Sequence, residues 1–140
     1  MTYTISQVAR MFHLQPSTLR YYEAQGLLTE IKKTSNQQRI YEDKHIKRLR
    51  TICCFKRAGM TIRQLQEFFA YEKDLEHHCP EIIALLEKSR KEIAETIATL
   101  EQDYQHLLRK IHFYTDTEKA IEKGEDQPAW KDYRDQNFPD

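Results

Sequence analysis

A chain of 140 residues can bury one modest core and carry one extended element, which argues against a large catalytic domain. Charged residues make up 31% and aromatic residues 11%, with only 3 glycines and 4 prolines, so a mostly α fold is expected. The formal net charge is zero, but residues 1–75 hold 13 Lys or Arg against 7 Asp or Glu, net +6, and residues 76–140 hold 9 against 15, net −6.

Two short helices are expected first. Thr4 can cap the first helix. Its apolar residues, spaced i, i+3, i+4 and i+7, are Ile5, Val8, Ala9 and Phe12. Pro16 suits the first turn of a second helix, PSTLRYYEAQ, and Gly26 supplies the left-handed residue that closes it. This arrangement predicts a helix-turn-helix whose second helix enters the major groove of DNA.

The second helix and the segment after it carry the candidate DNA contacts. At the start of the helix, Leu19 points inward, and the small or hydrogen-bonding residues are Ser17, Thr18, Arg20 and Tyr21. In GLLTEIKKTSNQQRIY, β-favouring residues flank a polar turn, which predicts a two-stranded wing that carries Lys32, Lys33 and Arg39. From Lys32 to Arg57 there are nine basic and two acidic residues, as expected of a phosphate-binding surface.

A third helix is expected from near Glu42 to Gly59, and a fourth over TIRQLQEFFAY. The fourth helix opens with a possible capping box, in which Thr61 and Gln64 satisfy each other's backbone donors. The apolar faces of both helices should complete one small core with the first helix. We therefore expect a winged helix-turn-helix DNA-binding domain over residues 1–75.

A long helix with a coiled-coil seam is expected over residues 79–114. Nine of ten positions spaced three and four apart are apolar or aromatic, where the 39% hydrophobic composition would give about four by chance. These ten positions are Ile83, Leu86, Arg90, Ile93, Ile97, Leu100, Tyr104, Leu107, Ile111 and Tyr114. A 75-residue domain cannot cover such a seam, so a homodimer is expected.

Two further features of this C-terminal half are Arg90 and the residues after the seam. Arg90 interrupts the seam, and either fixes the register of the paired helices or extends its charged end to solvent. Residues 115–140, with Trp130, Tyr133 and Phe138 among charges, are expected to form a loosely packed C-terminal tail.

The segments TISQVARMF, STLRYYEAQGLL, RIY and CFKRAGMTIRQLQEF, followed by a heptad helix, resemble the MerR family of bacterial transcription regulators over about residues 2–114. The resemblance implies a winged domain joined to a dimerisation helix that pairs antiparallel with its twin. No cofactor is expected. The resemblance also implies a mechanism in which the dimer binds an overlong promoter spacer. The effector then makes the dimer bend and untwist the spacer until bacterial RNA polymerase can use the promoter.

The resemblance also implies roles for single residues of the second helix and of the wing, at positions that match the family motif. They place Ser17 and Thr18 in the major groove. They assign phosphate contacts to Arg20 and Tyr21, and they use Arg39 with Tyr41 to hold the wing to the DNA backbone. Lys33 is expected to contact phosphate from the wing. The sequence departs from the family where TE follows GLL instead of a proline and where the wing reads QQR instead of GYR.

The chain has three cysteines, an odd number, and shows neither a signal peptide nor an apolar run near the ~20 residues of a membrane span. These features predict that the protein resides in the reducing cytoplasm. On a helical wheel, Cys53 falls within the apolar face of the third helix and is expected to fill space. Cys54 falls on the opposite side, near Lys47, Arg50 and Arg57, and these cations favour its thiolate.

Within the MerR family, the chain also resembles a branch that senses aldehydes and other electrophiles. That branch carries one cysteine five residues before the glycine that ends this helix, and Cys54 precedes Gly59 by five. The resemblance implies that an electrophile or oxidant modifies Cys54 and shifts the dimer toward its activating form.

Other functions remain open to different degrees. Cys79 lies beside His77 and His78 and before Pro80, at the expected start of the long helix, and is a rival sensor. Three consecutive residues cannot easily surround a tetrahedral zinc ion, so no metal site is assigned. A metal ion or small molecule bound at the dimer interface is the alternative effector. A coiled-coil adaptor without DNA binding explains residues 83–114 but leaves the basic half and STLRYYEAQGLL unexplained. The sequence offers no paired carboxylates on a pocket and no phosphate loop, so it does not favour an enzyme.

Overall fold

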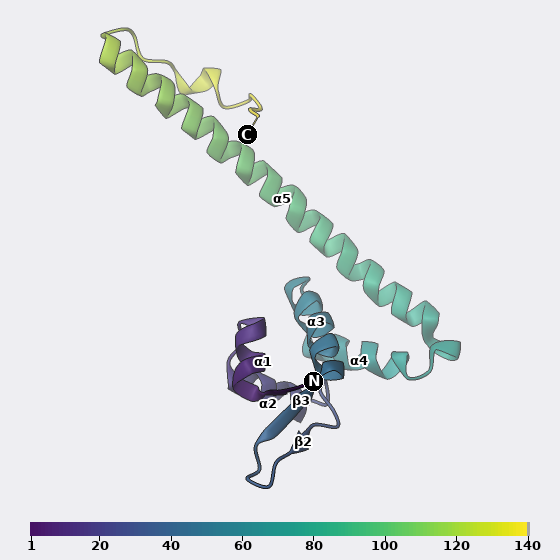
Figure 1. The fold of residues 1–140 in the computed structure, drawn as a ribbon. Helices are drawn as coiled ribbons and strands as arrows, with labels where there is room; N and C mark the ends of the chain where they lie inside the picture. Colours follow the sequence, from purple (N-terminus) through teal and green to yellow (C-terminus); the bar gives the residue numbers. More distant parts are fainter. Residues whose placement is uncertain (140) are drawn as a thin grey trace. The chain divides into compact units, whose positions relative to one another are not determined.

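The computed structural model describes residues 1–139 and is mostly helical, as expected (Figure 1). It divides into two compact units, Met1–Ile93 and the part of the chain from Ala94 onward. Helix α5 (Leu75–Lys123) contributes residues to both. Within the described residues, no helix is both long enough and apolar enough to cross a membrane.

Helices α1 (Ile5–Phe12) and α2 (Pro16–Ala24) form the helix-turn-helix. The Thr4 hydroxyl accepts a hydrogen bond from the Gln7 backbone N–H at 3.2 Å, and the Gln7 side chain accepts one from the Thr4 N–H at 2.8 Å. This reciprocal capping box starts α1. Gly26 has a φ of 76°, the left-handed conformation predicted for the residue that closes α2.

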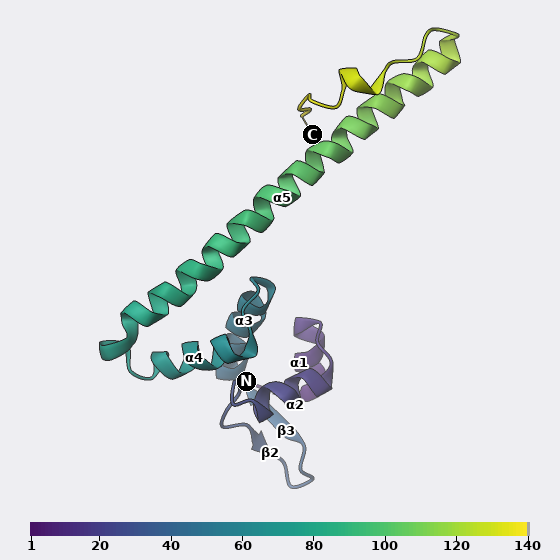
Figure 2. The same cartoon turned by 180° about the vertical axis from the view of Figure 1, so that it is seen from behind.

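The wing is a three-stranded antiparallel sheet and not the two-stranded hairpin expected. Strand β3 (Arg39–Glu42) lies between β2 (Lys32–Lys33) and β1 (Thr2–Thr4). Figure 2 shows β2 and β3 side by side. Tyr3 pairs with Tyr41, and Lys33 pairs with Arg39. The extra strand joins the wing to the start of α1, because β1 leads directly into that helix.

Helices α3 (Asp43–Arg57) and α4 (Ile62–Glu72) confirm the next two predicted helices. Thr61 and Gln64 form the expected capping box at the start of α4, with hydrogen bonds of 3.1 and 2.9 Å. Gly59 ends the turn between the two helices with a φ of 94°, which a residue with a side chain would adopt only with strain.

One apolar core holds these elements together. Its buried residues are Val8, Ala9, Leu19, Tyr22, Leu27, Leu28, Tyr41, Ile46, Leu49, Ile52, Met60, Leu65, Phe68 and Phe69. Ile82 and Leu85, from the first part of α5, pack against this core, and Ser89 one turn later is buried. The N-terminal unit therefore buries one face of the start of α5.

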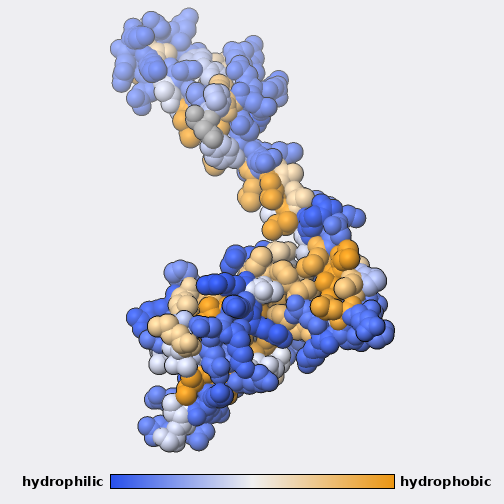
Figure 3. Space-filling model, turned by 45° about the vertical axis from the view of Figure 1, so that its right-hand side comes forward, coloured by the Kyte–Doolittle hydropathy of each residue, from blue (hydrophilic) through white to orange (hydrophobic). Residues whose placement is uncertain are grey.

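Helix α5 extends beyond both ends of the predicted segment 79–114. Pro80 is its sixth residue and not its first, so the helix continues through a position where the backbone has no N–H to donate. Apolar side chains gather along α5 on the surface (Figure 3).

The C-terminal tail packs against α5, so the prediction of a loosely packed tail is wrong. The Phe138 ring stacks on His112 with centroids 4.1 Å apart, and the Phe138 backbone N–H donates to the Gln105 side chain at 3.0 Å. Trp130, in the short 3₁₀ helix Trp130–Asp132, contacts Phe113 at 5.5 Å between ring centroids. Residues 115–123, which were expected to belong to the tail, continue the helix.

Candidate nucleic-acid interface and thiol site

Helix α2 exposes the side chains that were predicted to meet DNA. Ser17, Arg20 and Tyr21 are exposed and Thr18 is half-buried, whereas Leu19 is fully buried. The helix is held by its apolar face, so its polar face is free of the core. This is the division of faces that a recognition helix needs, because base edges and phosphates must be reached by side chains fixed on a rigid element.

The wing presents exposed cations from β2. Lys33 and Lys32 are both exposed, and the Lys32 ammonium lies 3.6 Å from a carboxylate oxygen of Glu42 on the neighbouring strand. Lys33 is therefore the β2 cation better placed to contact a phosphate. Both lysines are on the same small sheet as Arg39.

Arg39 is held by a carboxylate that sequence reasoning missed. Its Nε donates to Glu23 Oε2 of α2 at 2.6 Å, and both side chains are half-buried. This hydrogen bond to Glu23 raises the pKa of Arg39. The pair therefore fastens β3 to the recognition helix and sets the position of the wing.

Tyr41 does not fit the role predicted for it. Its side chain is 0% exposed, its hydroxyl has no hydrogen-bond partner among the described residues, and burial raises its pKa. A buried phenol cannot reach the DNA backbone, so the prediction of a phosphate contact is corrected. Tyr41 is a core residue, because its position in β3 points the ring toward His45, at 5.9 Å between ring centroids.

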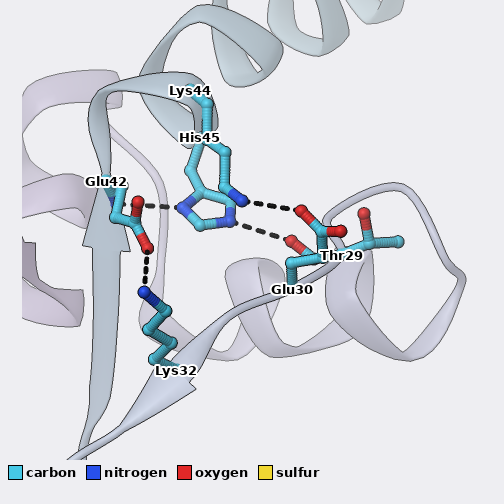
Figure 4. A network of polar contacts seen from close by, with 6 residues as sticks. All are labelled: Thr29, Glu30, Lys32, Glu42, Lys44 and His45. Carbon is cyan, nitrogen blue, oxygen red and sulfur yellow. Dashed lines mark hydrogen bonds and ion pairs between the residues drawn. The ribbon is translucent and has the colours of Figure 1, made fainter.

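His45 joins the wing to α3, a function that the sequence did not reveal. Its Nδ1 accepts a hydrogen bond from the Glu42 backbone N–H at 2.9 Å, and its Nε2 lies 2.8 Å from the Thr29 carbonyl oxygen (Figure 4). Because Nδ1 accepts in the first contact, Nε2 is the ring nitrogen that donates to the Thr29 carbonyl. The Lys44–Glu30 ion pair, 2.7 Å long, lies beside it.

The two neighbouring cysteines of α3 differ in environment as predicted. Cys53 is half-buried, and its burial raises the pKa of its thiol. Cys54 is exposed, on the same exposed face as Lys47, Arg50 and Arg57. The next residue, Phe55, packs against the core and meets Phe68 of α4 edge to face at 5.0 Å. A change at Cys54 is thus one residue from the core that also receives the start of α5.

Cys79 is exposed and is the fifth residue of α5, so the expected position at the helix start is wrong. His77 Nδ1 lies 2.9 Å from Asp74, and the His78 ring lies 5.0 Å from the ring of Tyr71. Over residues 1–139, no three side chains of the His, Cys, Asp or Glu type come close enough to hold a metal ion.

The predicted seam lies open to solvent in the single chain. All nine of its large apolar or aromatic residues are 37–62% exposed. Arg90, the exception in the pattern, donates to Glu87 one turn earlier at 2.7 Å. Packed chains rarely leave so long an apolar stripe uncovered, so this face is a candidate interface.

Comparison with known proteins matches this chain to one family of helix-turn-helix regulators. Residues 3–72 match the family model of MerR HTH family regulatory proteins, and residues 46–110 match the family model described as MerR, DNA binding. The chain is 30% identical over 122 residues to a ZntR homolog, an HTH-type transcriptional regulator of Haemophilus influenzae, with 87% of this chain and 86% of that protein covered.

Two further similarities concern different lengths of the chain. The transcriptional regulator AdhR of Bacillus subtilis is 41% identical over 64 residues, 46% of each protein. The structure of HiNmlR, a MerR family regulator lacking the sensor domain and bound to promoter DNA, aligns with a TM-score of 0.77 at 26% identity and covers 99% of this chain and 100% of that one.

Proposed function

The chain belongs to the MerR family of helix-turn-helix regulatory proteins, and on that premise we propose that it works in the cytoplasm as a homodimer that activates transcription by distorting a promoter spacer. It is a DNA-binding transcription regulator and not an enzyme. The finer proposal concerns its effector: the dimer responds to aldehydes, other electrophiles or oxidants through Cys54. We keep the DNA-binding domain over residues 1–75 and the dimerisation segment over residues 79–114 as part of this proposal, with the tail beginning after Lys123, where α5 ends.

The exposed seam is the observation that carries the dimer. An antiparallel pairing of two α5 helices centred between Ala98 and Thr99 brings every seam position opposite another seam position. The resulting pairs are Ile97 with Leu100, Ile93 with Tyr104, Arg90 with Leu107, Leu86 with Ile111, and Ile83 with Tyr114. Such a self-complementary surface is what a two-fold symmetric interface requires.

DNA binding follows from the exposed face of α2 and from the wing. Ser17 and Thr18 are proposed to lie in the major groove, and Arg20, Tyr21 and Lys33 to contact phosphates. Arg39 supports the wing through Glu23, and the rest of its guanidinium group is proposed to contact the DNA backbone. Two such modules on one duplex would meet major grooves about 34 Å apart, and bending of the spacer would contribute specificity.

Sensing at Cys54 is supported by its exposure and by its proximity to the shared core. Addition of the thiolate sulfur to an electrophilic carbon removes one negative charge from a face that carries Lys47, Arg50 and Arg57. The neighbouring Phe55 packs with Phe68, and Ile82 and Leu85 of α5 pack on the same core. A shift at this point is therefore transmitted toward the dimerisation helix.

The test is footprinting and transcription with bacterial RNA polymerase on the promoter of the protein's own gene, with and without formaldehyde. We expect formaldehyde to raise transcription for wild type and Cys79→Ser, and to have no effect on Cys54→Ser, which still protects the operator. An unchanged response in Cys54→Ser would contradict the assignment. Zinc retained by the native dimer in mass spectrometry would favour a metal effector instead.

A further inference from the structure

The turn between α3 and α4 is tied to the backbone of the residues around Cys54. The Met60 N–H donates to the Phe55 carbonyl at 3.0 Å, and the Gly59 N–H donates to the Lys56 carbonyl at 3.1 Å. With Gly59 in the left-handed conformation, these two bonds form a Schellman motif. The Cys54 carbonyl accepts the hydrogen bond of the C-cap N–H at 3.0 Å. A displacement of the helix at Cys54 is therefore passed on to the turn.

The same turn lies against α5. A Cβ atom added to Gly59 would lie 3.9 Å from Oε2 of Glu92, an ordinary contact distance. One turn before Glu92, Ser89 is only 8% exposed, and Ile82 and Leu85 pack against the core from the preceding turns. The side of α5 that faces the first unit therefore runs from the core to the turn and brings Glu92 to the end of α3.

Opposing charges act on the Glu92 carboxylate at this place. The C-terminal end of a helix carries partial negative charge, which disfavours a nearby carboxylate. The last turn of α3 also carries Lys56 and Arg57, whose positive charges favour it. The Lys56 ammonium donates to the Met60 carbonyl at 3.1 Å, so one of these cations is fixed on the turn itself. The contact is therefore sensitive to a change of charge in the last turns of α3.

We propose, on the premise that Cys54 is the sensor of the proposed function, that Glu92 is the positioning residue through which α5 responds to it. Addition of the Cys54 thiolate to formaldehyde forms one S–C bond, the carbonyl oxygen takes a proton from water, and no group leaves. The reaction removes a negative charge three residues before Arg57, on the same side of the helix. The cations of the last turn then hold the Glu92 carboxylate more strongly against the turn.

The response reaches the seam because Glu92 is next to seam positions. Ile93 follows it directly, and Arg90 lies two residues earlier. A closer approach of Glu92 to the turn changes the angle at which these seam positions leave the first unit. An effector can shift an equilibrium only by interacting differently with its two states, and the charge at Cys54 supplies that difference here.

Glu92→Gln removes the charge and keeps the length of the side chain, and Glu92→Lys reverses the charge. Glu95→Gln and Glu95→Lys are matched controls, because Glu95 is an exposed carboxylate of the same helix, three residues later. Transcription by bacterial RNA polymerase from the promoter of the protein's own gene is measured with and without formaldehyde. The affinity of the untreated protein for the operator is measured beside it, together with the rate at which iodoacetamide alkylates Cys54, followed by peptide mass spectrometry.

We expect activation by formaldehyde to be about threefold weaker in Glu92→Gln than in wild type, and weaker still in Glu92→Lys. Operator affinity and the alkylation rate of Cys54 should match wild type, because Glu92 acts after the reaction and away from DNA. Both Glu95 variants should respond as wild type does.

Activation of the Glu92 variants equal to that of the Glu95 controls would overturn the role of Glu92 while leaving Cys54 as the sensor. A loss of operator affinity in Glu92→Gln would also overturn it, because the residue would then support the fold and not the response. If wild type does not respond to formaldehyde, or if Cys54→Ser still responds, the proposed function itself fails, whatever the Glu92 variants do.

Discussion

The core of the first unit and the seam of α5 contain the same kinds of residue but treat them in opposite ways. Leu19, Leu49 and Ile52 are fully buried by their own chain, whereas Ile97, Leu100 and Leu107 are more than half exposed. A buried Leu or Ile side chain contributes about 1.5–3 kcal/mol. The first region is therefore stabilised by its own contacts, and the second gains that stabilisation only when something covers it.

The largest expected effect breaks the seam at its centre. In Leu100→Asp, the two-fold symmetry of the proposed dimer introduces the charge twice, next to Ile97 of each partner. We expect the dimer to lose about 5 kcal/mol or more, which is close to four orders of magnitude in its dissociation constant. Sedimentation equilibrium measures the change.

Thr99→Asp is the matched control, because the helical wheel places Thr99 away from the seam. It should remain a dimer, and far-ultraviolet circular dichroism should show the first unit folded in both variants. A Leu100→Asp protein that stays dimeric at micromolar concentration would show that this face is not the interface.

The second prediction breaks the self-contained core. Leu49 is fully buried on α3, and Leu49→Ala leaves a cavity among residues from several elements. We expect the free energy of unfolding of the first unit to fall by about 3 kcal/mol. Urea denaturation followed by circular dichroism measures the loss, and the exposed Lys47→Ala on the same helix should change it by less than about 0.5 kcal/mol. An equal loss in both variants would contradict the contrast between core and surface.

Much of this contrast could be predicted from the sequence, because its signals are local. Thr4 and Thr61 cap their helices through residues three positions later, and the seam follows a spacing of three and four. The capping boxes, the closing glycine and the spacing of apolar residues depend only on neighbours along the chain. These features were therefore visible before any tertiary contact was known.

What the sequence did not reveal depends on distant residues. Gln105 and Phe138 are 33 positions apart, and no local pattern indicates that the tail returns to them. Glu23 and Arg39, like His45 and Thr29, are separated by 16 residues. Tyr41 was assigned to DNA by motif, but its burial depends on how β3 pairs with β1, which is also a non-local event.

A third prediction sharpens the comparison within α5 itself. At about 100° per residue, the positions that contact the tail lie on the helix face opposite the seam, so the chain covers that face and leaves the seam open. Phe113 meets both Trp130 and Tyr133, at 5.5 and 5.4 Å between ring centroids. Phe113→Ala should reduce the free energy with which the tail packs against α5 by about 2 kcal/mol.

Trp130 is the single tryptophan of the chain, so its fluorescence reports this packing directly. We expect Phe113→Ala to shift the emission to longer wavelength and Thr115→Ala, which alters an exposed residue nearby, to leave it unchanged. The dimer should persist in both variants, because the seam is untouched. Identical spectra for the two variants would mean that the tail does not depend on this aromatic cluster.

The smallest effect tests whether the DNA-binding half also fixes its own wing. Glu23 and Arg39 are 26% and 25% exposed, so Glu23→Gln removes a partly buried charged hydrogen bond and should lower the free energy of unfolding by about 1 kcal/mol. Glu67→Gln breaks the Arg63 pair, whose side chains are 44% and 88% exposed, and should cost about 0.3 kcal/mol. Urea denaturation compares the free energies of unfolding of the two variants.

Hydrogen exchange should also become faster at the amides of residues 32–40 in Glu23→Gln but not in Glu67→Gln, because of these two ion pairs only Glu23–Arg39 joins the wing to the recognition helix. Equal exchange in both variants would mean that the sheet, and not the ion pair, holds the wing in place.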